Sequence, residues 1–230
     1  MKKLVFLTGA GISAESGITT FRDAGGLWEQ YPVMQVASIE GYRQDPALVI
    51  DFYNQRRRQL TTVEPNQAHL LVAQLQERFE ITVVTQNIDN LHERAGSRHI
   101  IHLHGELTKA TSSRNPNDPR QIVELSAKNP DIHMGDKARD GSQLRPFIVW
   151  FGEAVPQIEP AAEAVMKADI LVVVGTSLNV YPAAGLVSYA SPQAELYLID
   201  PKPNVPHGLP VHVIAKPATQ GMADLCALLK

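Results

Sequence analysis

The residues best suited to chemistry near the amino terminus are the small ones in the stretch Thr8 to Arg22, T-G-A-G-I-S-A-E-S-G-I-T-T-F-R. The stretch follows the apolar run Leu4 to Leu7, and Gly9, Gly11 and Ala14 have the spacing G-x-G-x-x-A. This spacing lets a strand turn sharply into a helix whose first amide groups face an anion. It favours binding of a dinucleotide pyrophosphate, although such a turn also occurs where nothing binds.

The residues after this turn argue against hydride transfer. A dehydrogenase continues into a second strand that ends in an acidic residue about 20 positions later. Here Gly17 to Arg22 leads into D-A-G-G-L-W at 23–28, which is typical of a mobile loop. We therefore expect the chain to hold a dinucleotide for a different reaction.

A second polar group, Q-N-I-D-N at 86–90, follows the β-branched run Ile81 to Thr85. In open α/β sheets ligands bind beyond the carboxyl ends of the strands, so this group stands where a ligand is expected. An Asx turn that only closes the strand is the alternative. A further turn of small residues, Gly175-Thr176-Ser177, follows the run Ile170 to Val174.

The elements that must position these residues alternate between strands and helices. The hydrophobic patterns predict strands at 4–7, 81–85, 99–104, 147–151, 170–174, 195–199 and 211–215. They predict helices at 45–60, 66–79, 158–168, 182–190 and 219–229, and a short helix that ends at Ala95. The segment from Thr108 to Leu144 shows no clear period and is interpreted as an insertion. We predict an α/β fold with a mostly parallel sheet covered on both faces.

Composition narrows the possible partners and location. The 230 residues carry a formal charge of -3, which gives no electrostatic reason to expect nucleic acid as a partner. No apolar run approaches the roughly 20 residues that span a bilayer, and no signal peptide is recognisable, so we expect a cytoplasmic protein without a membrane partner. The lone cysteine, Cys226, cannot form an internal disulfide or a thiolate metal cluster.

Four separated stretches together resemble one family: G-A-G-I-S-A-E-S-G-I-T-T-F-R at 9–22, T-Q-N-I-D at 85–89, H-L-H-G-E-L at 102–107 and V-G-T-S-L-N-V-Y-P-A-A at 174–184. The chain resembles the sirtuins, NAD-dependent protein deacylases, over nearly its whole length. The resemblance implies a Rossmann-like, DHS-like NAD-binding fold that forms a single sirtuin domain over 1–230. A large part would comprise 1–22, 61–107 and 146–230, and a small domain would be built from insertions at 23–60 and 108–145.

The resemblance also implies that His104, which precedes Gly105, is the general base; a hydrogen-bonded core histidine is the alternative. An imidazole with the ordinary pKa of about 6.5 can accept a proton at neutral pH. In the implied reaction the acyl oxygen of a modified lysine attacks C1′ of the nicotinamide ribose, and nicotinamide leaves. His104 deprotonates a ribose hydroxyl, and the 2′-oxygen takes the acyl group. The products would be free lysine, nicotinamide and O-acyl-ADP-ribose.

Contacts to NAD are implied along the whole chain. Asn87 and Asp89 would orient the carboxamide and ribose, and Asn87 is counted with His104 as catalytic. Phe21 and Arg22 would cover NAD as the loop closes and excludes water. The implied NAD-binding residues are Gly9, Ala10, Gly11, Ser13, Phe21, Arg22, Trp28, Gln86, Asn87, Ile88, Asp89, Gly175, Thr176, Ser177, Asp200 and Ala218.

Tyr53 and Arg56 stand three residues apart on a predicted helix, so both side chains project from one face. They resemble the Y-x-x-R signature of the sirtuin subgroup that removes succinyl and malonyl groups. A phenol hydroxyl and a guanidinium suit a carboxylate at the far end of an acyl chain. The alternative is a solvated basic face, because Arg57 and Arg58 follow directly.

The segment V-W-F-G-E at 149–153 resembles the sirtuin strand to which an extended substrate peptide adds by backbone pairing. Val149 and Phe151 are the substrate-binding residues that this implies. An ordinary core strand is the alternative, and both interpretations can hold together.

The chain departs from the family in its insertion, where most sirtuins carry two C-x-x-C pairs that bind a structural zinc. With His133 and several carboxylates but no cysteine there, the segment falls short of a zinc site, and we predict no metal. The insertion is expected to be held instead by a shorter path across the sheet or by apolar contacts from Ile122, Val123, Leu125, Ile132 and Met134. A second departure is Leu198, which cannot form a hydrogen bond with the adenosine ribose, so Asp200 is expected to bind it instead.

Three functions remain open from the sequence. The first is removal of succinyl, malonyl and also acetyl groups from lysine of protein substrates, by a monomer. The second is NAD-dependent mono-ADP-ribosyl transfer, and the third is non-catalytic binding of NAD or ADP-ribose. His104 with Asn87 and Asp89 argues against a pure binding module, and Tyr53 with Arg56 argues against a transferase.

Overall fold

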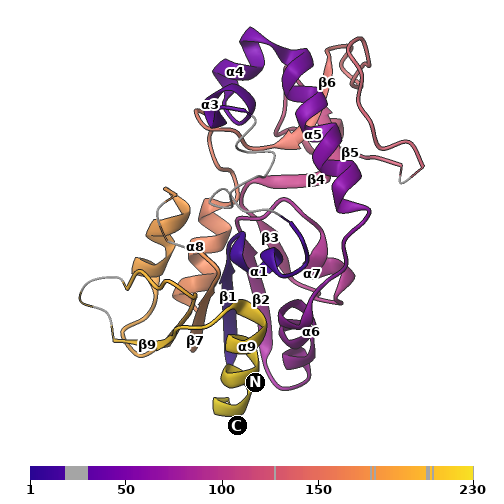
Figure 1. Cartoon of the computed structure of the whole chain (residues 1–230). Coiled ribbons are helices and arrows are strands. Elements are labelled where there is room, and N and C mark those ends of the chain that lie inside the picture. Colours follow the sequence, from indigo (N-terminus) through magenta and orange to yellow (C-terminus); the bar gives the residue numbers. More distant parts are fainter. Residues whose placement is uncertain are drawn as a thin grey trace.

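The computed structural model describes residues 1–18, 31–126, 128–176, 178, 180–205, 208 and 210–229. Its centre is a six-stranded sheet in the order β3-β2-β1-β7-β8-β9, with every neighbouring pair parallel. The strands are Lys3–Thr8 (β1), Glu80–Thr85 (β2), Ile100–His102 (β3), Ile170–Val174 (β7), Glu195–Ile199 (β8) and Val211–Ile214 (β9). The predicted α/β class with a parallel sheet is confirmed (Figure 1).

Helices cover both faces of this sheet, which explains why its strands are almost continuously apolar. Leu4 and Phe6 of β1 share one buried cluster with α6 (Gln67–Gln74) and α9 (Ala218–Leu228). Val5 and Leu7 point to the opposite face and pack against α8 (Ile158–Met166) and η3 (Ala183–Tyr189). The helix predicted at 182–190 is present as the 3₁₀ helix η3. The helix predicted at 66–79 is present as α6, which the 3₁₀ helix η1 (Leu75–Glu77) continues.

A second, antiparallel sheet has the order β5-β4-β6 and comprises Gly105–Ser112 (β4), Val123–Glu124 (β5) and Leu144–Ile148 (β6). The segment from Thr108 was predicted to lack regular structure, which is wrong for the end of β4. The strand predicted at 147–151 is present as β6, three residues earlier at 144–148. Thr111 and Ser112 pair with Arg145 and Leu144, a long-range pairing that local periodicity does not reveal.

Figure 1 shows this small sheet beside α3 (Val33–Val36), α4 (Ile39–Gln44) and α5 (Pro46–Leu60), at one end of the parallel sheet. Helix α5 begins as predicted, with the Asp45 side chain accepting from the Leu48 amide. One buried cluster joins its residues to Ile132 and the β4 strand. Of the residues expected to hold the insertion, Ile132 is buried, Val123 and Leu125 pack against the cluster, but Met134 is exposed.

Polar side chains of α5 also hold the insertion. The Asn54 amide pairs with the backbone of Ile132 in both directions, at 2.8 Å and 3.0 Å. Arg57 donates to the carbonyls of Leu107 and Pro130 at 2.7 Å and 2.9 Å, and to Asn54 Oδ1 at 2.8 Å. These bonds tie the insertion to α5.

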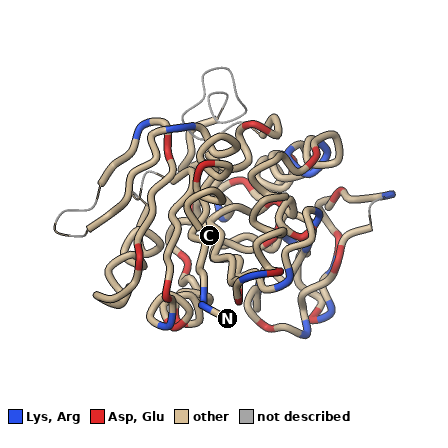
Figure 2. The backbone as a smooth tube through the Cα atoms, turned by 90° about the horizontal axis from the view of Figure 1, so that it is seen from below, with Lys and Arg blue, Asp and Glu red and all other residues tan. Residues whose placement is uncertain are grey.

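Charge is mixed over the described chain, and Figure 2 shows Lys and Arg interspersed with Asp and Glu. Within the described residues, none of the helices combines the length and the apolar character needed to cross a bilayer.

Candidate functional site

Two turns meet at the carboxyl ends of β1 and β7, where the strand order reverses direction. The Gly9 amide donates to Val174 O at 3.0 Å, and the Gly11 amide donates to Gly175 O at 2.8 Å. A Cβ on Gly9 would lie 2.6 Å from Thr176 Cβ, and one on Gly11 would lie 2.6 Å from Gly175 Cα. Both glycines are therefore required by the close contact of the two turns, before any ligand is considered.

A buried polar network lies directly behind the first turn. Ser13, on α1 (Gly11–Ala14), accepts from Asn87 Nδ2 at 3.1 Å and donates to Asp89 Oδ2 at 2.9 Å. Asn87 Nδ2 also donates to Gly9 O at 3.2 Å. The β1 turn and the segment after β2 are thereby joined into one site, which brings four predicted NAD-binding residues together.

Asp89 is almost fully buried, and its second oxygen accepts from the Leu91 amide at 3.1 Å, at the start of α7 (Leu91–Arg94). Burial raises the pKa of the Asp89 carboxyl, while the bonds from Leu91 and Ser13 oppose that shift. The bond from Leu91 to Asp89 Oδ1 forms the Asx turn that the sequence allowed as an alternative. The other oxygen of the same carboxylate accepts from Ser13 and so belongs to the buried network.

Two buried histidines support this network and were not predicted from the sequence. His69 Nε2 lies 3.5 Å from Ser13 Oγ, and His92 Nε2 lies 3.1 Å from Thr8 Oγ1. Burial lowers the pKa of His69 to about 4 and that of His92 well below its usual value, so both rings are neutral at pH 7. The spacing N-x-x-H at Asn66 to His69, which forms a capping box, was the available signal.

His104 lies in the tight turn between β3 and β4, not inside a strand as the alternation from His99 predicted. The next residue explains the turn, since Gly105 has φ +81° and a Cβ there would lie 2.1 Å from Phe147 O. His104 Nδ1 donates to Gln86 O at 3.0 Å, because a carbonyl oxygen can only accept. The lone pair of the neutral ring is therefore on Nε2, where a general base needs it.

The electrostatic setting of His104 suits a base. Burial lowers the pKa of the ring, and the bond to Gln86 opposes this shift in part. The ring is therefore neutral, and able to accept a proton, at neutral pH. Gln86 also links the site to the β7 turn, since its Nε2 donates to Thr176 Oγ1 at 3.1 Å.

The residues predicted for the adenosine end follow β7 and β8. Asp200 is buried and its Oδ1 accepts from the Lys202 amide at 2.8 Å. Leu198 lies in the core on one face of the sheet. Ala218 begins α9 and is buried. Phe21, Arg22, Trp28 and Ser177 lie outside the described residues.

Tyr53 and Arg56 are both buried on α5, so the alternative of a solvated basic face is wrong for Arg56. It is also wrong for Arg57, and it holds only for Arg58, whose side chain is 53% exposed. Trp150 Nε1 donates to Tyr53 Oη at 3.0 Å. Burial raises the pKa of Tyr53 to about 12, with the nearby Arg56 charge opposing it, so the phenol is protonated at neutral pH.

Burial lowers the pKa of Arg56, and the neighbouring Tyr53 and Asp89 oppose that shift. Tyr53 belongs to the buried cluster that joins α5 to the small sheet, and the Asp89 carboxylate acts on the Arg56 guanidinium electrostatically.

The segment predicted to pair with a substrate peptide is only partly open. Strand β6 ends at Ile148, and the Val149 amide donates to His104 O at 3.0 Å. The Phe151 amide donates to Ala37 O at 2.9 Å, and Phe151 O accepts from Ile39 at 3.0 Å. A substrate backbone would have to pair with other groups, although the Phe151 side chain is 43% exposed.

Comparisons with known proteins agree with this geometry. The Sir2 family model matches residues 9–182. An NAD-dependent protein deacylase of Bacteroides thetaiotaomicron is 64% identical over 230 residues, covering 100% of this chain and 98% of the relative. An NAD-dependent protein deacylase of Helicobacter pylori is 53% identical over 227 residues, covering 98% and 96%.

Solved structures show the same likeness. A complex of a Sir2 homologue mutant with ADP-ribose matches with a TM-score of 0.88 at 36% identity, covering 98% of this chain and 91% of that one. A complex of a Sir2 homologue with NAD matches with a TM-score of 0.85 at 36% identity, covering 99% and 89%.

Proposed function

Since the chain belongs to the Sir2 family and is an NAD-dependent protein deacylase, we propose that it removes succinyl and malonyl groups, as well as acetyl groups, from protein lysines. The products would be free lysine, nicotinamide and O-acyl-ADP-ribose. The observation that carries the choice of acyl group is the buried pair of Tyr53 and Arg56.

The hydrogen bonds around Tyr53 support this choice. Trp150 uses its single N–H to donate to the phenol oxygen, so the phenol proton remains for another acceptor. A carboxylate at the end of an acyl chain accepts such a proton and is attracted by the positive charge of Arg56. A methyl group, as in acetyl-lysine, does neither.

The residues of the NAD site fit a dinucleotide. The glycine turns allow close backbone contact, and both hydrogens of Asn87 Nδ2 are used by Gly9 and Ser13, which leaves Oδ1 to accept from a ribose hydroxyl. NAD supplies the electrophilic ribose carbon, and His104 Nε2 would take the proton from a ribose hydroxyl. Asn87 would hold that ribose in place.

Replacing Arg56 by Leu tests the proposal with two peptides that differ only in carrying succinyl-lysine or acetyl-lysine. We expect kcat/KM for the succinyl peptide to fall on the order of 10- to 100-fold, because one charged hydrogen bond is lost. Activity on the acetyl peptide should change by less than about threefold. Arg58→Leu, on the exposed side of the same helix, is the matched control and should leave both activities unchanged.

Loss of both activities to the same extent, or full succinyl removal by Arg56→Leu, would show that the acyl assignment is wrong. A transferase would give a different result with the wild-type protein. It would release nicotinamide and leave ADP-ribose attached to a protein side chain, without forming O-acyl-ADP-ribose.

A further inference from the structure

His104 and His102, two residues apart, each form a hydrogen bond with a backbone carbonyl, and the two carbonyls belong to consecutive residues. His104 Nδ1 donates to Gln86 O at 3.0 Å, and His102 Nδ1 donates to Asn87 O at 3.2 Å. Both carbonyls belong to the segment after β2 that carries the candidate nicotinamide-binding side chains. The first imidazole is the candidate base, but the proposed reaction gives the second no role.

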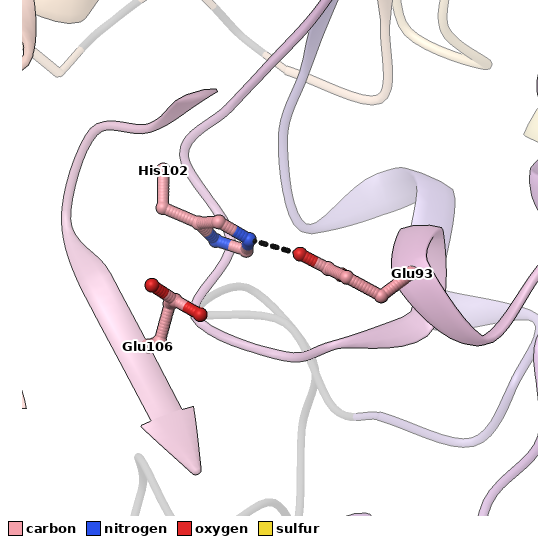
Figure 3. A group of neighbouring side chains, drawn as sticks. All are labelled: Glu93, His102 and Glu106. Carbon is pink, nitrogen blue, oxygen red and sulfur yellow. Dashed lines mark hydrogen bonds and ion pairs between the residues drawn. The ribbon is translucent and has the colours of Figure 1, made fainter. Parts of the chain in front are cut away.

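The two rings differ at Nε2. His102 Nε2 lies 2.6 Å from Glu93 Oε1 (Figure 3), and its side chain is only 8% exposed. Because the Asn87 carbonyl and the Glu93 carboxylate both accept, the ring must donate from both nitrogens. The contacts of His102 are thus those of an imidazolium ion.

Other charged groups surround this ring. Glu106 of β4 also approaches it, and the three side chains place ligand atoms within 4.8 Å of one another (Figure 3). Lys109 pairs with Glu106 at 2.8 Å and with Glu124 at 3.3 Å, so its charge is shared between two carboxylates. Glu106 adds to the negative field at His102, but Glu93 is the anionic partner that contacts the ring directly.

The protonated ring also acts on the groups behind it. Burial opposes the charge, but the Glu93 bond prevails and raises the pKa of His102 above its usual value. The positive ring helps to lower the pKa of Asp89 and that of the neighbouring His92. It therefore favours the ionised form of Asp89 and the neutral form of His92, against or alongside the larger effect of burial, in addition to contacting the Asn87 backbone.

We propose that His102, held by Glu93, is a positioning residue for NAD that fixes the Asn87 to Asp89 segment at the nicotinamide end. This inference rests on the proposed NAD site. When the ring loses its proton, its Nε2 lone pair faces the Glu93 carboxylate, and the contact becomes repulsive. The segment then loses its support, and NAD binds more weakly.

Two amide substitutions separate this role from packing. An asparagine amide occupies the place of Nδ1, so His102→Asn keeps the donor to Asn87 O. A glutamine amide reaches the place of Nε2, so His102→Gln keeps only the contact with Glu93. By calorimetry without peptide at pH 7, we expect NAD affinity within about threefold of wild type for His102→Asn and a loss of about tenfold for His102→Gln.

The affinity for ADP, which lacks both the nicotinamide ring and its ribose, is the control and should change by less than about threefold in both variants. In steady-state assays the KM for NAD should rise for His102→Gln while kcat changes little. Glu93→Gln, which keeps a neutral acceptor but removes the charge, should lower the pH at which the KM for NAD begins to rise.

The wild-type KM for NAD should rise as pH increases from about 7 to 9, whereas His102→Asn, which has no proton to lose, should show no such rise. Equal NAD affinity for His102→Asn and His102→Gln, or a wild-type KM that does not depend on pH, would overturn the inference. These results would leave the acyl assignment intact, because NAD binding is measured without any acyl peptide.

Discussion

Trp150 Nε1 donates to Tyr53 Oη at 3.0 Å, and this bond joins the segment that follows β6 to the middle of α5. Both rings are buried. The bond fixes the phenol oxygen while leaving its proton free to be donated. Two segments about a hundred residues apart thus build one half of the proposed acyl pocket.

Replacing Trp150 by Phe removes that donor and keeps an aromatic ring. We expect kcat/KM for succinyl-lysine peptides to fall about fivefold, the effect of one neutral hydrogen bond, with a smaller change for acetyl-lysine peptides. Tyr42→Phe, which alters the ring packed against Trp150 at a centroid distance of 4.7 Å, is the control and should leave the ratio of the two activities unchanged. An unchanged ratio in Trp150→Phe would contradict a role of Tyr53 in acyl recognition.

Local patterns predicted the parallel sheet because the runs Leu4 to Leu7 and Ile170 to Val174 are buried on both faces and are therefore continuously apolar. The same patterns could not predict β4 and β6, whose residues pair across a long insertion. Charge alone suggested that Arg57 is solvated, yet its guanidinium is buried against backbone carbonyls.

Within the candidate site, the motifs placed Asn87, Asp89 and Ser13 on segments that the structure brings into one hydrogen-bonded network. His92 was missed because it is a single histidine on a helix, with no local feature that distinguishes a network member from a surface residue. His69 had only its N-x-x-H spacing with Asn66, which indicates a helix cap and not a contact with Ser13.

The hydrogen bonds of Asn54 should stabilise the insertion. Asn54→Ala removes both bonds to Ile132 and one acceptor of Arg57, so we expect the free energy of unfolding to fall by about 2–4 kcal/mol. Arg58→Ala, which removes exposed ion pairs from the same helix, should cost less than about 1 kcal/mol. Urea denaturation measures both, and equal losses would show that Asn54 does not anchor the segment. A chelator should leave the wild-type midpoint unchanged.

Stability should depend on pH through the buried histidines. Burial lowers the pKa of His69 from 6.5 to about 4, so below pH 6.5 the unfolded chain takes up a proton that the folded chain does not. The free energy of unfolding should therefore fall as pH falls from 6.5 toward 4, by up to about 3 kcal/mol from this residue.

The control for this pH dependence is His69→Gln, measured by urea denaturation at the same pH values. It should flatten the decline, although the neutral His92 keeps part of it. If both proteins lose stability in parallel as pH falls, His69 is not the group responsible.

Gly105 should be required by the turn that places His104. Gly105→Ala must adopt φ +81° and also brings a Cβ to 2.1 Å from Phe147 O. Gly96→Ala has the same kind of backbone, φ +99°, but no atom within 4 Å of the new Cβ. We expect the free energy of unfolding of Gly105→Ala to fall by at least about 1–2 kcal/mol more than that of Gly96→Ala. Gly105→Ala should also lose deacylase activity, because the turn that places His104 is distorted. Similar thermal midpoints for the two variants would refute the steric argument.

The most direct measurement uses the wild-type protein with NAD and an equimolar mixture of the succinyl-lysine and acetyl-lysine peptides. Mass spectrometry then quantifies the acyl-ADP-ribose products. Our account predicts that O-succinyl-ADP-ribose forms together with nicotinamide and exceeds O-acetyl-ADP-ribose. Formation of O-acetyl-ADP-ribose alone would contradict the proposed acyl pocket, and release of no nicotinamide with either peptide would contradict the proposed site as a whole.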